Sequence, residues 1–171
     1  MIIREATPED AVQLIAIYNP FIRNSIATFE EIEITAEEMA DRIVSIENIG
    51  APFLIAEKDE TISGYAYASL WKARSAYRHT IEVSVYVDSH FHGRGLGRAL
   101  YTQLFSILHK MDYHAVMGVI TLPNDASVHL HESFGLQKVA HFAEVGRKFN
   151  QWIDVGYWQG FLQDMPKTPA D

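Results

Sequence analysis

A strand, a glycine-rich turn and a helix in direct succession constrain this sequence more than any other feature. Residues 81–87 alternate β-branched residues with polar or aromatic ones, and this period of two predicts a strand. From Leu96 onward the apolar residues recur at spacings of three and four, which predicts a helix. The turn between them, residues 93–98, would aim unpaired backbone N–H groups at one spot near the positive end of the helix dipole. The stretch therefore predicts a binding site for a phosphate or pyrophosphate.

The glycine spacing narrows the kind of phosphate ligand. A dinucleotide-binding fingerprint needs a third glycine, but that position is Arg98 when counted from Gly93 and Leu100 when counted from Gly95. A nucleoside-triphosphate loop needs a final Gly-Lys-Ser/Thr, and the sequence has none. Arg94 and Arg98 add positive charge to the turn, which favours a bound anion over a turn with no ligand.

Length and composition indicate a single globular domain. The chain has 171 residues, enough for one core and too few to expect two. It has neither a long apolar run nor a secretion signal, so we expect a cytoplasmic location and no membrane contact. A formal net charge of −8 argues against nucleic-acid binding. Because the chain has no cysteine, disulfides, thiolate metal sites and a cysteine acyl-enzyme are excluded.

The rest of the chain predicts a mixture of strands and helices. A strand at residues 2–4 precedes a helix that is capped by Thr7 and ended by Pro20. A second helix is capped by Thr35 and extends to Asn48. Further elements are a helix at residues 126–134, ended by Gly135, and strands at residues 53–56, 62–70, 115–120, 139–145 and 151–161. This order predicts one α/β domain with a mixed sheet.

Three segments resemble one branch of a known enzyme family. They are residues 77–87, 122–132 and 152–159. They are similar to the phosphinothricin and methionine sulfoximine acetyltransferases, which belong to the GNAT N-acetyltransferases, and the likeness extends over roughly residues 2–162. The resemblance implies the GNAT fold over residues 1–163, a single α/β domain with a central mixed, mostly antiparallel sheet flanked by helices. It also implies a homodimer, and residues 164–171 are expected to form a flexible tail.

The resemblance implies that acetyl-CoA binds along the strand and the glycine turn. The backbone of residues 85–87 would pair with the pantetheine arm, and one N–H would polarise the thioester carbonyl. Residues 93–98 would hold the pyrophosphate, with His92 where the family usually has Gln or Arg, a change expected to alter affinity slightly. Asn124 matches a cofactor position, but an ordinary helix cap is an equal alternative. The implied cofactor residues are Val85, Tyr86, Val87, Gly93, Arg94, Gly95, Leu96, Gly97, Arg98 and Asn124.

Glu82 is the candidate general base. Transfer of an acyl group from a thioester needs a neutral amine, whereas a free α-amine near pH 7 is largely ammonium. Glu82 is a lone carboxylate in an otherwise apolar strand, and the resemblance places the base at this position. Burial would raise its pKa, and it could act through a water molecule. A surface-facing strand glutamate is the structural alternative.

His131 is the second candidate catalytic residue. In the broad GNAT pattern a tyrosine at this place donates a proton to the departing thiolate, and Asn124, Ser127, Leu130 and Gly135 fit the rest of that pattern. Histidine here is a feature of the phosphinothricin-like branch. It could orient the substrate or act as the acid, and a purely structural histidine is the third alternative.

The histidines do not predict a metal site. His90 with His92, and His129 with His131, are two residues apart, a spacing that on a helix turns the rings away from each other. No cysteine or carboxylate cluster completes either pair, so we expect no metal. The absence of cysteine also favours direct attack of the amine on the thioester over a covalent enzyme intermediate.

The loop at residues 71–78 predicts an anionic acceptor, because it concentrates basic residues in an acidic chain. Lys72 and Arg74 would hold a carboxylate, phosphinate or sulfoximine-type group, with Arg78 as a third candidate. A small α-amino-acid analogue such as phosphinothricin, methionine sulfoximine or methionine sulfone fits these demands. The expected acceptor site comprises Phe29, Lys72, Ala73, Arg74, His131 and Phe149.

Two other functions fit the same motifs. An enzyme that acetylates protein N-termini would have an open groove and would be insensitive to charge reversal in the basic loop. A sensor that binds acyl-CoA without turnover would tolerate the loss of Glu82.

Overall fold

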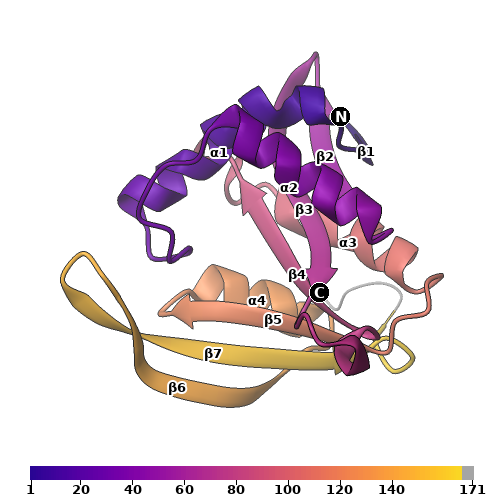
Figure 1. Cartoon of the computed structure of the whole chain (residues 1–171), viewed down its shortest axis with the longest axis vertical. Coiled ribbons are helices and arrows are strands. Elements are labelled where there is room, and N and C mark those ends of the chain that lie inside the picture. Colours follow the sequence, from indigo (N-terminus) through magenta and orange to yellow (C-terminus); the bar gives the residue numbers. More distant parts are fainter. Residues whose placement is uncertain (167–171) are drawn as a thin grey trace.

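The strands form one sheet in the order β1-β2-β3-β4-β5-β7-β6 in the computed structural model, which describes residues 1–166 (Figure 1). Every neighbouring pair is antiparallel except β4 with β5. The strands are β1 (Ile2–Glu5), β2 (Phe53–Lys58), β3 (Thr61–Leu70), β4 (Thr80–Val87), β5 (Ala115–Leu122), β6 (Gln137–Lys148) and β7 (Gln151–Phe161). The helices are α1 (Ala11–Asn24), α2 (Ala36–Asn48), α3 (Leu96–Leu108) and α4 (Asp125–Ser133). The expected α/β fold with a mixed, mostly antiparallel sheet is confirmed.

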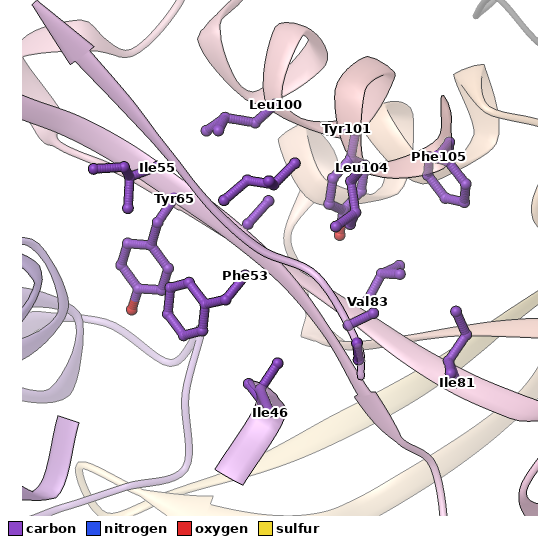
Figure 2. Packing of buried hydrophobic residues seen from close by; sticks show 14 of the residues in the cluster. Ile46, Phe53, Ile55, Tyr65, Ile81, Val83, Leu100, Tyr101, Leu104 and Phe105 are labelled. Atoms are coloured by element: carbon purple, nitrogen blue, oxygen red, sulfur yellow. The ribbon is translucent and has the colours of Figure 1, made fainter. Parts of the chain in front are cut away.

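Helices cover both faces of the sheet. Helices α1 and α2 pack on one face, where the ring of Tyr18 lies edge-on to the ring of Tyr86 with centroids 4.9 Å apart. Helix α3 packs on the other face against β2, β3 and β4. Figure 2 shows the two layers of the core, with Phe53 and Tyr65 on one side of the strands and Leu100 on the other. Alternate residues of β4 therefore face different layers.

Helix α1 is longer than the sequence predicts. The expected capping box is present, but it begins a short 3-10 turn (Pro8–Asp10) that leads into α1. Pro20, expected to end the helix, lies inside it, and α1 ends at Asn24. The buried side chains of Tyr18 and Ile22, four residues apart on one face of the helix, lie on either side of the proline. Their packing holds the helix together despite the missing N–H donor.

Strand β6 also extends beyond its predicted range of residues 139–145. Gly146 was expected to begin a loop, yet it stays in the strand because the ring of Phe29 packs on it and leaves no room for a Cβ. The hairpin turn is instead formed by Phe149 and Asn150, whose φ angles are 52° and 60°. A two-residue turn with positive φ matches the twist of a β-hairpin.

Residues 164–166, the start of the expected flexible tail, pack on the domain. Met165 is buried, and its sulfur lies close to Gly160 of β7. Residues 167–171 lie outside the described residues. The domain boundary at residue 163 stays a prediction.

Candidate active site

Strands β4 and β5 separate and leave a cleft between them. Their parallel pairing joins only residues 80–82 to residues 115–117. Beyond this point a cleft of about 520 Å³ opens, lined by the rest of β4, the glycine turn, α3, α4 and β5. Since β4 pairs with β3 and β5 pairs with β7 on their outer edges, the inner edges face the cleft without a strand partner. Backbone N–H and C=O groups along residues 83–87 are therefore available to an extended ligand.

The glycine turn forms one end of this cleft. Gly93 and Gly95 have φ angles of +71° and +74°, a backbone conformation that residues other than glycine rarely adopt. Gly95 is the N-cap of α3, so the first N–H groups of the helix point into the turn. The side chain of Arg98 lines the cleft, while the exposed Arg94 has its guanidinium 5.6 Å from the centre of the Phe91 ring. The cleft thus brings the expected cofactor residues together, except that Arg94 is not among the residues lining it.

His92 ties the glycine turn to β4. Its Nε2 lies 2.8 Å from the carbonyl oxygen of Val87, which can only accept, so Nε2–H donates. His92 also lines the cleft. The replacement of the usual Gln or Arg therefore still supplies a donor, which here fixes the turn against the strand.

Asn124 fits both alternatives that the sequence left open. Its Oδ1 accepts a hydrogen bond of 3.2 Å from the N–H of Ser127 and so caps α4. The same residue lines the cleft. A contact with cofactor stays a prediction.

His131 is a buried, neutral histidine at the wall of the cleft. Its Nδ1 lies 2.7 Å from the backbone oxygen of Ser127, which can only accept, so Nδ1 carries a hydrogen. Burial lowers the pKa of His131, so Nε2 is unprotonated and accepts a hydrogen bond of 3.1 Å from the Tyr101 hydroxyl. The ring lies against β5 at Gly118, where an added Cβ would be 2.4 Å from Cδ2. His131 in this state is an acceptor, not a proton donor toward the cleft.

Glu82 lies where the cleft closes. It is the last residue of β4 that pairs with β5, and its side chain shares a face with Ser84 and Tyr86, toward α1 and α2. The side chain is half-buried. Burial raises the pKa of Glu82, and the nearby Lys72 ammonium partly offsets this rise. The strand glutamate is therefore not simply surface-facing, because it keeps a desolvated carboxylate beside the cleft.

The expected acceptor residues come from four separate segments, one of which is α4 with His131. Lys72 and Arg74 lie in the exposed loop after β3, and the Lys72 ammonium is 5.1 Å from the centre of the Trp71 ring. Phe29 lies in the α1–α2 loop against β6, and Phe149 lies in the β6–β7 turn, both partly exposed. The electrostatic contact with Glu82 connects Lys72 to the site. Placement of all six expected residues around an acceptor, Lys72 and His131 included, stays a prediction.

Lys148 joins two of those segments and was not singled out from the sequence. Its Nζ donates to the backbone oxygens of Ser25 and Thr28 at 2.7 and 2.8 Å, and the residue is 3% exposed. The lysine thus fixes the α1–α2 loop, which carries Phe29, to the end of β6. The burial of Lys148 is what marks it as a structural tie. A lysine in a polar stretch of sequence gives no sign that it is buried, so no sequence pattern pointed to this residue.

Tyr101 and Thr121 also line the cleft without having been singled out. Tyr101 is part of the apolar helical stripe of α3, so its pattern predicted core packing alone. The Thr121 hydroxyl is buried and has no hydrogen-bond partner among the described residues. A buried hydroxyl without a partner costs stability. A ligand in the cleft that forms a hydrogen bond with this hydroxyl would remove the cost.

The described residues contain no group of three or more His, Cys, Asp or Glu side chains arranged to hold a metal ion. Within residues 1–166, no helix has both the length and the apolar character needed to cross a membrane.

This fold and cleft define a class of enzyme. The family described as "Acetyltransferase (GNAT) domain" matches residues 3–156. The chain belongs to the GNAT family and is an N-acetyltransferase.

Individual relatives connect the chain to one branch of that family. The phosphinothricin N-acetyltransferase of Streptomyces viridochromogenes is 40% identical over 168 residues, which cover 98% of this chain and 90% of the relative. The L-methionine sulfoximine/L-methionine sulfone acetyltransferase of Salmonella typhimurium is 30% identical over 159 residues, which cover 93% of this chain and 93% of the relative. A crystal structure of a phosphinothricin acetyltransferase from Sinorhizobium meliloti with acetyl-CoA has a TM-score of 0.91 and 28% identity, covering 99% of this chain and 93% of that chain. The expected GNAT fold and the resemblance to this branch are confirmed.

Proposed function

We propose that the protein transfers the acetyl group of acetyl-CoA to the α-amine of a small amino-acid analogue of the phosphinothricin, methionine sulfoximine or methionine sulfone type. The observation that carries this proposal is the cleft between β4 and β5, which closes beside the desolvated carboxylate of Glu82. The names of the relatives and the acetyl-CoA in a solved relative support the donor and the acceptor class.

Acetyl-CoA would occupy the cleft in an extended conformation. The pantetheine arm pairs with the free backbone edge of residues 85–87, and an N–H of this edge polarises the thioester carbonyl. The pyrophosphate lies on the turn at residues 93–98, where the N-terminus of α3 and Arg98 favour negative charge. Asn124 and the unpaired hydroxyl of Thr121 contact the cofactor from the opposite wall.

The transfer would be direct. Glu82, through a water molecule, takes a proton from the ammonium form of the acceptor. The neutral nitrogen attacks the thioester carbonyl carbon and a C–N bond forms. The C–S bond breaks, the nitrogen loses its second proton to give the amide, and the coenzyme A thiolate takes up one proton to leave as the free thiol. Because His131 is neutral and accepts from Tyr101, we assign it a positioning role that fixes the Tyr101 hydroxyl at the cleft wall. A ternary complex follows from this scheme.

We also propose that the protein is a cytoplasmic homodimer. Phe142 and Val145 of β6 and Trp152 of β7 are large apolar side chains that are about half or more exposed, at 48%, 60% and 61%. An apolar surface of this kind is typical of an interface between subunits. Light scattering on the purified protein tests the dimer: a mass of one chain at micromolar concentration contradicts it.

A thiol-release assay tests the function. Acetyl-CoA is offered with methionine sulfone, methionine sulfoximine, phosphinothricin and a peptide with a free N-terminus. We expect thiol release with the amino-acid analogues, intersecting double-reciprocal lines for the two substrates, and no acetylated protein after incubation with acetyl-CoA alone. Release with the peptide only, or binding of acetyl-CoA with no release, would overturn the proposal.

A further inference from the structure

A second cavity lies on the face of the sheet that Glu82 shares with α1 and α2. Its volume is about 360 Å³, at the lower end of the range for small-ligand pockets. It lies between α2 and the strands β2 and β3, and its walls include Tyr18, Arg42, Phe53, Tyr65, Tyr67 and Ser69. This acceptor-side cavity shares no lining residue with the cleft between β4 and β5.

The cavity begins next to the general base. Ser69, one of its lining residues, is directly opposite Glu82 in the antiparallel pairing of β3 with β4, and Tyr67 is opposite Ser84. Side chains that are directly opposite in such a pair have Cβ atoms about 5 Å apart on the same face. Tyr67, Ser69 and Arg42 line the same cavity, and burial raises the pKa of Tyr67. An acceptor amine at Glu82 would therefore have the cavity beside it.

The walls are aromatic and the rim is charged. The rings of Phe53, Tyr65 and Tyr67 stack, with centroids 5.1 Å apart for Phe53 and Tyr67. Arg42 of α2 is the cation at the rim, and its guanidinium lies 5.8 Å from the centre of the Tyr18 ring. The positive charge of Arg42 is already matched, because its Nη2 donates to Glu30 at 2.5 Å, and the exposed Asp41 lies beside it.

We propose that this cavity takes the side chain of the acceptor and that the Glu30–Arg42 ion pair makes the enzyme select an uncharged side chain with a polar tip. Methionine sulfone and methionine sulfoximine are of this kind, and the phosphinate of phosphinothricin is not. The inference rests on the proposed function, since it deepens the choice among its three acceptors.

The three groups of an α-amino acid then have separate partners. The amine faces Glu82, the carboxylate faces Lys72 just beyond the end of β3, and the side chain enters the cavity past Ser69. Its methylene groups pack on the aromatic walls, and its polar tip accepts hydrogen bonds from the tyrosine hydroxyls or from Arg42 donors that Glu30 does not use. A phosphinate at the same place meets the Asp41 carboxylate, and the Arg42 guanidinium that lines the cavity is already paired with Glu30.

Substitution of Glu30 tests the inference by changing the charge at the rim. Glu30→Gln leaves Arg42 with an unmatched positive charge. We expect the ratio of kcat/KM for phosphinothricin to that for methionine sulfone to rise at least about tenfold. Arg42→Gln leaves the negative charges in excess and should lower the same ratio by a similar factor. Unchanged ratios in both variants overturn the inference.

Glu33→Gln is the matched control. Glu33 lies in the same loop and pairs with Arg23 at the surface, and Arg23, unlike Arg42, does not line the cavity. This variant should keep the wild-type ratio, and a shift equal to that of Glu30→Gln contradicts the inference.

Ser45→Trp fills the rim from α2 and should raise KM for methionine sulfone at least about tenfold with KM for acetyl-CoA unchanged. An unchanged KM for methionine sulfone overturns the inference as well.

The outcome for the proposed function is read separately. If wild-type protein releases thiol with none of the three analogues, the proposed function fails and the selectivity ratio has no value. If all three analogues react and the kcat/KM ratio is the same in wild type and in the Glu30 and Arg42 variants, the proposed function stands and only the cavity assignment fails.

Discussion

The cleft that we propose for acetyl-CoA and the side that we propose for the acceptor are built in different ways. The part of the cleft that we propose for the pantetheine arm and the pyrophosphate is mainly backbone: one strand edge, one glycine turn and one helix N-terminus within residues 83–98. The acceptor side consists of side chains from the α1–α2 loop, α2, β3, β4 and the basic loop. A ligand shared by a whole family can be held by backbone that many sequences provide. An acceptor that differs between branches is selected by side chains that can change one at a time.

Glu82→Gln separates the two regions most strongly. The amide cannot take a proton, so kcat/KM for the acceptor should fall about 10²- to 10⁴-fold. Binding of acetyl-CoA, measured by titration calorimetry, should stay within about twofold because Glu82 does not line the cleft. Equal losses in turnover and in acetyl-CoA binding would break the separation.

The same variant should be more stable than wild type at neutral pH. The pKa of Glu82 is raised in the folded protein, so its effect is most favourable below the unfolded pKa and is lost as pH rises through the folded pKa. Thermal unfolding midpoints should therefore be higher for Glu82→Gln at pH 7, and the difference should shrink as pH falls below about 4. A lower midpoint at pH 7 would contradict the desolvation of this carboxylate.

Gly95→Val tests the cofactor side. A side chain at φ +74° strains the turn by about 1–2 kcal/mol, although the space around it is open. We expect KM for acetyl-CoA to rise about tenfold or more, with KM for the acceptor little changed.

Gly50→Val is the matched control for this strain. Gly50 has φ +72° and open space around it, but it lies after α2, away from the cleft. It should lower stability by a similar amount and leave both KM values near wild type. A rise in KM for acetyl-CoA as large as that of Gly95→Val would show that general destabilisation explains the result.

Lys148→Met tests the acceptor side. Loss of the two hydrogen bonds to the α1–α2 loop should loosen Phe29 and raise KM for the acceptor about threefold to tenfold, with a smaller effect on acetyl-CoA. Lys138→Met is the control, because Lys138 lies on the same strand but its ammonium packs over the Trp158 ring. An equal rise in KM for the acceptor in both variants would contradict the proposal that Lys148 fixes the α1–α2 loop for acceptor binding.

Lys72→Met should raise KM for the acceptor, whose carboxylate the proposal gives to Lys72, and its smallest and most specific effect concerns the pH profile. Glu82 must be ionised to act as a base, so kcat/KM rises with pH through the pKa of Glu82. The Lys72 ammonium partly offsets the rise of that pKa, and its removal should move the acidic limb of the profile to higher pH. A limb that stays in place or moves to lower pH contradicts the contact between Lys72 and Glu82.

The contrast between the two regions also explains what the sequence could predict. The glycine turn, the strand before it and the helix after it follow from local spacing, and these elements place most of the cofactor cleft. Tyr101 as a partner of His131, and Lys148 as the tie of the α1–α2 loop, depend on contacts between residues 30 and more than 100 positions apart. Local patterns carry no information about such contacts.

Two local predictions were also wrong for reasons of tertiary packing. Pro20 does not end α1, because buried residues on both sides of it keep the helix packed. Gly146 does not end β6, because Phe29 occupies the space where a side chain would be. In both cases packing from a distant segment outweighs the local signal.

The most direct test is amide hydrogen exchange with and without acetyl-CoA, followed by mass spectrometry of peptides that cover β4 and the glycine turn. The cofactor should slow exchange at residues 83–87 and 93–98, while exchange in β2 and the α2 segment next to the acceptor-side cavity stays unchanged until an acceptor analogue is added. Protection by acetyl-CoA that appears around that cavity and leaves residues 83–98 unaffected would contradict the assignment of the two regions.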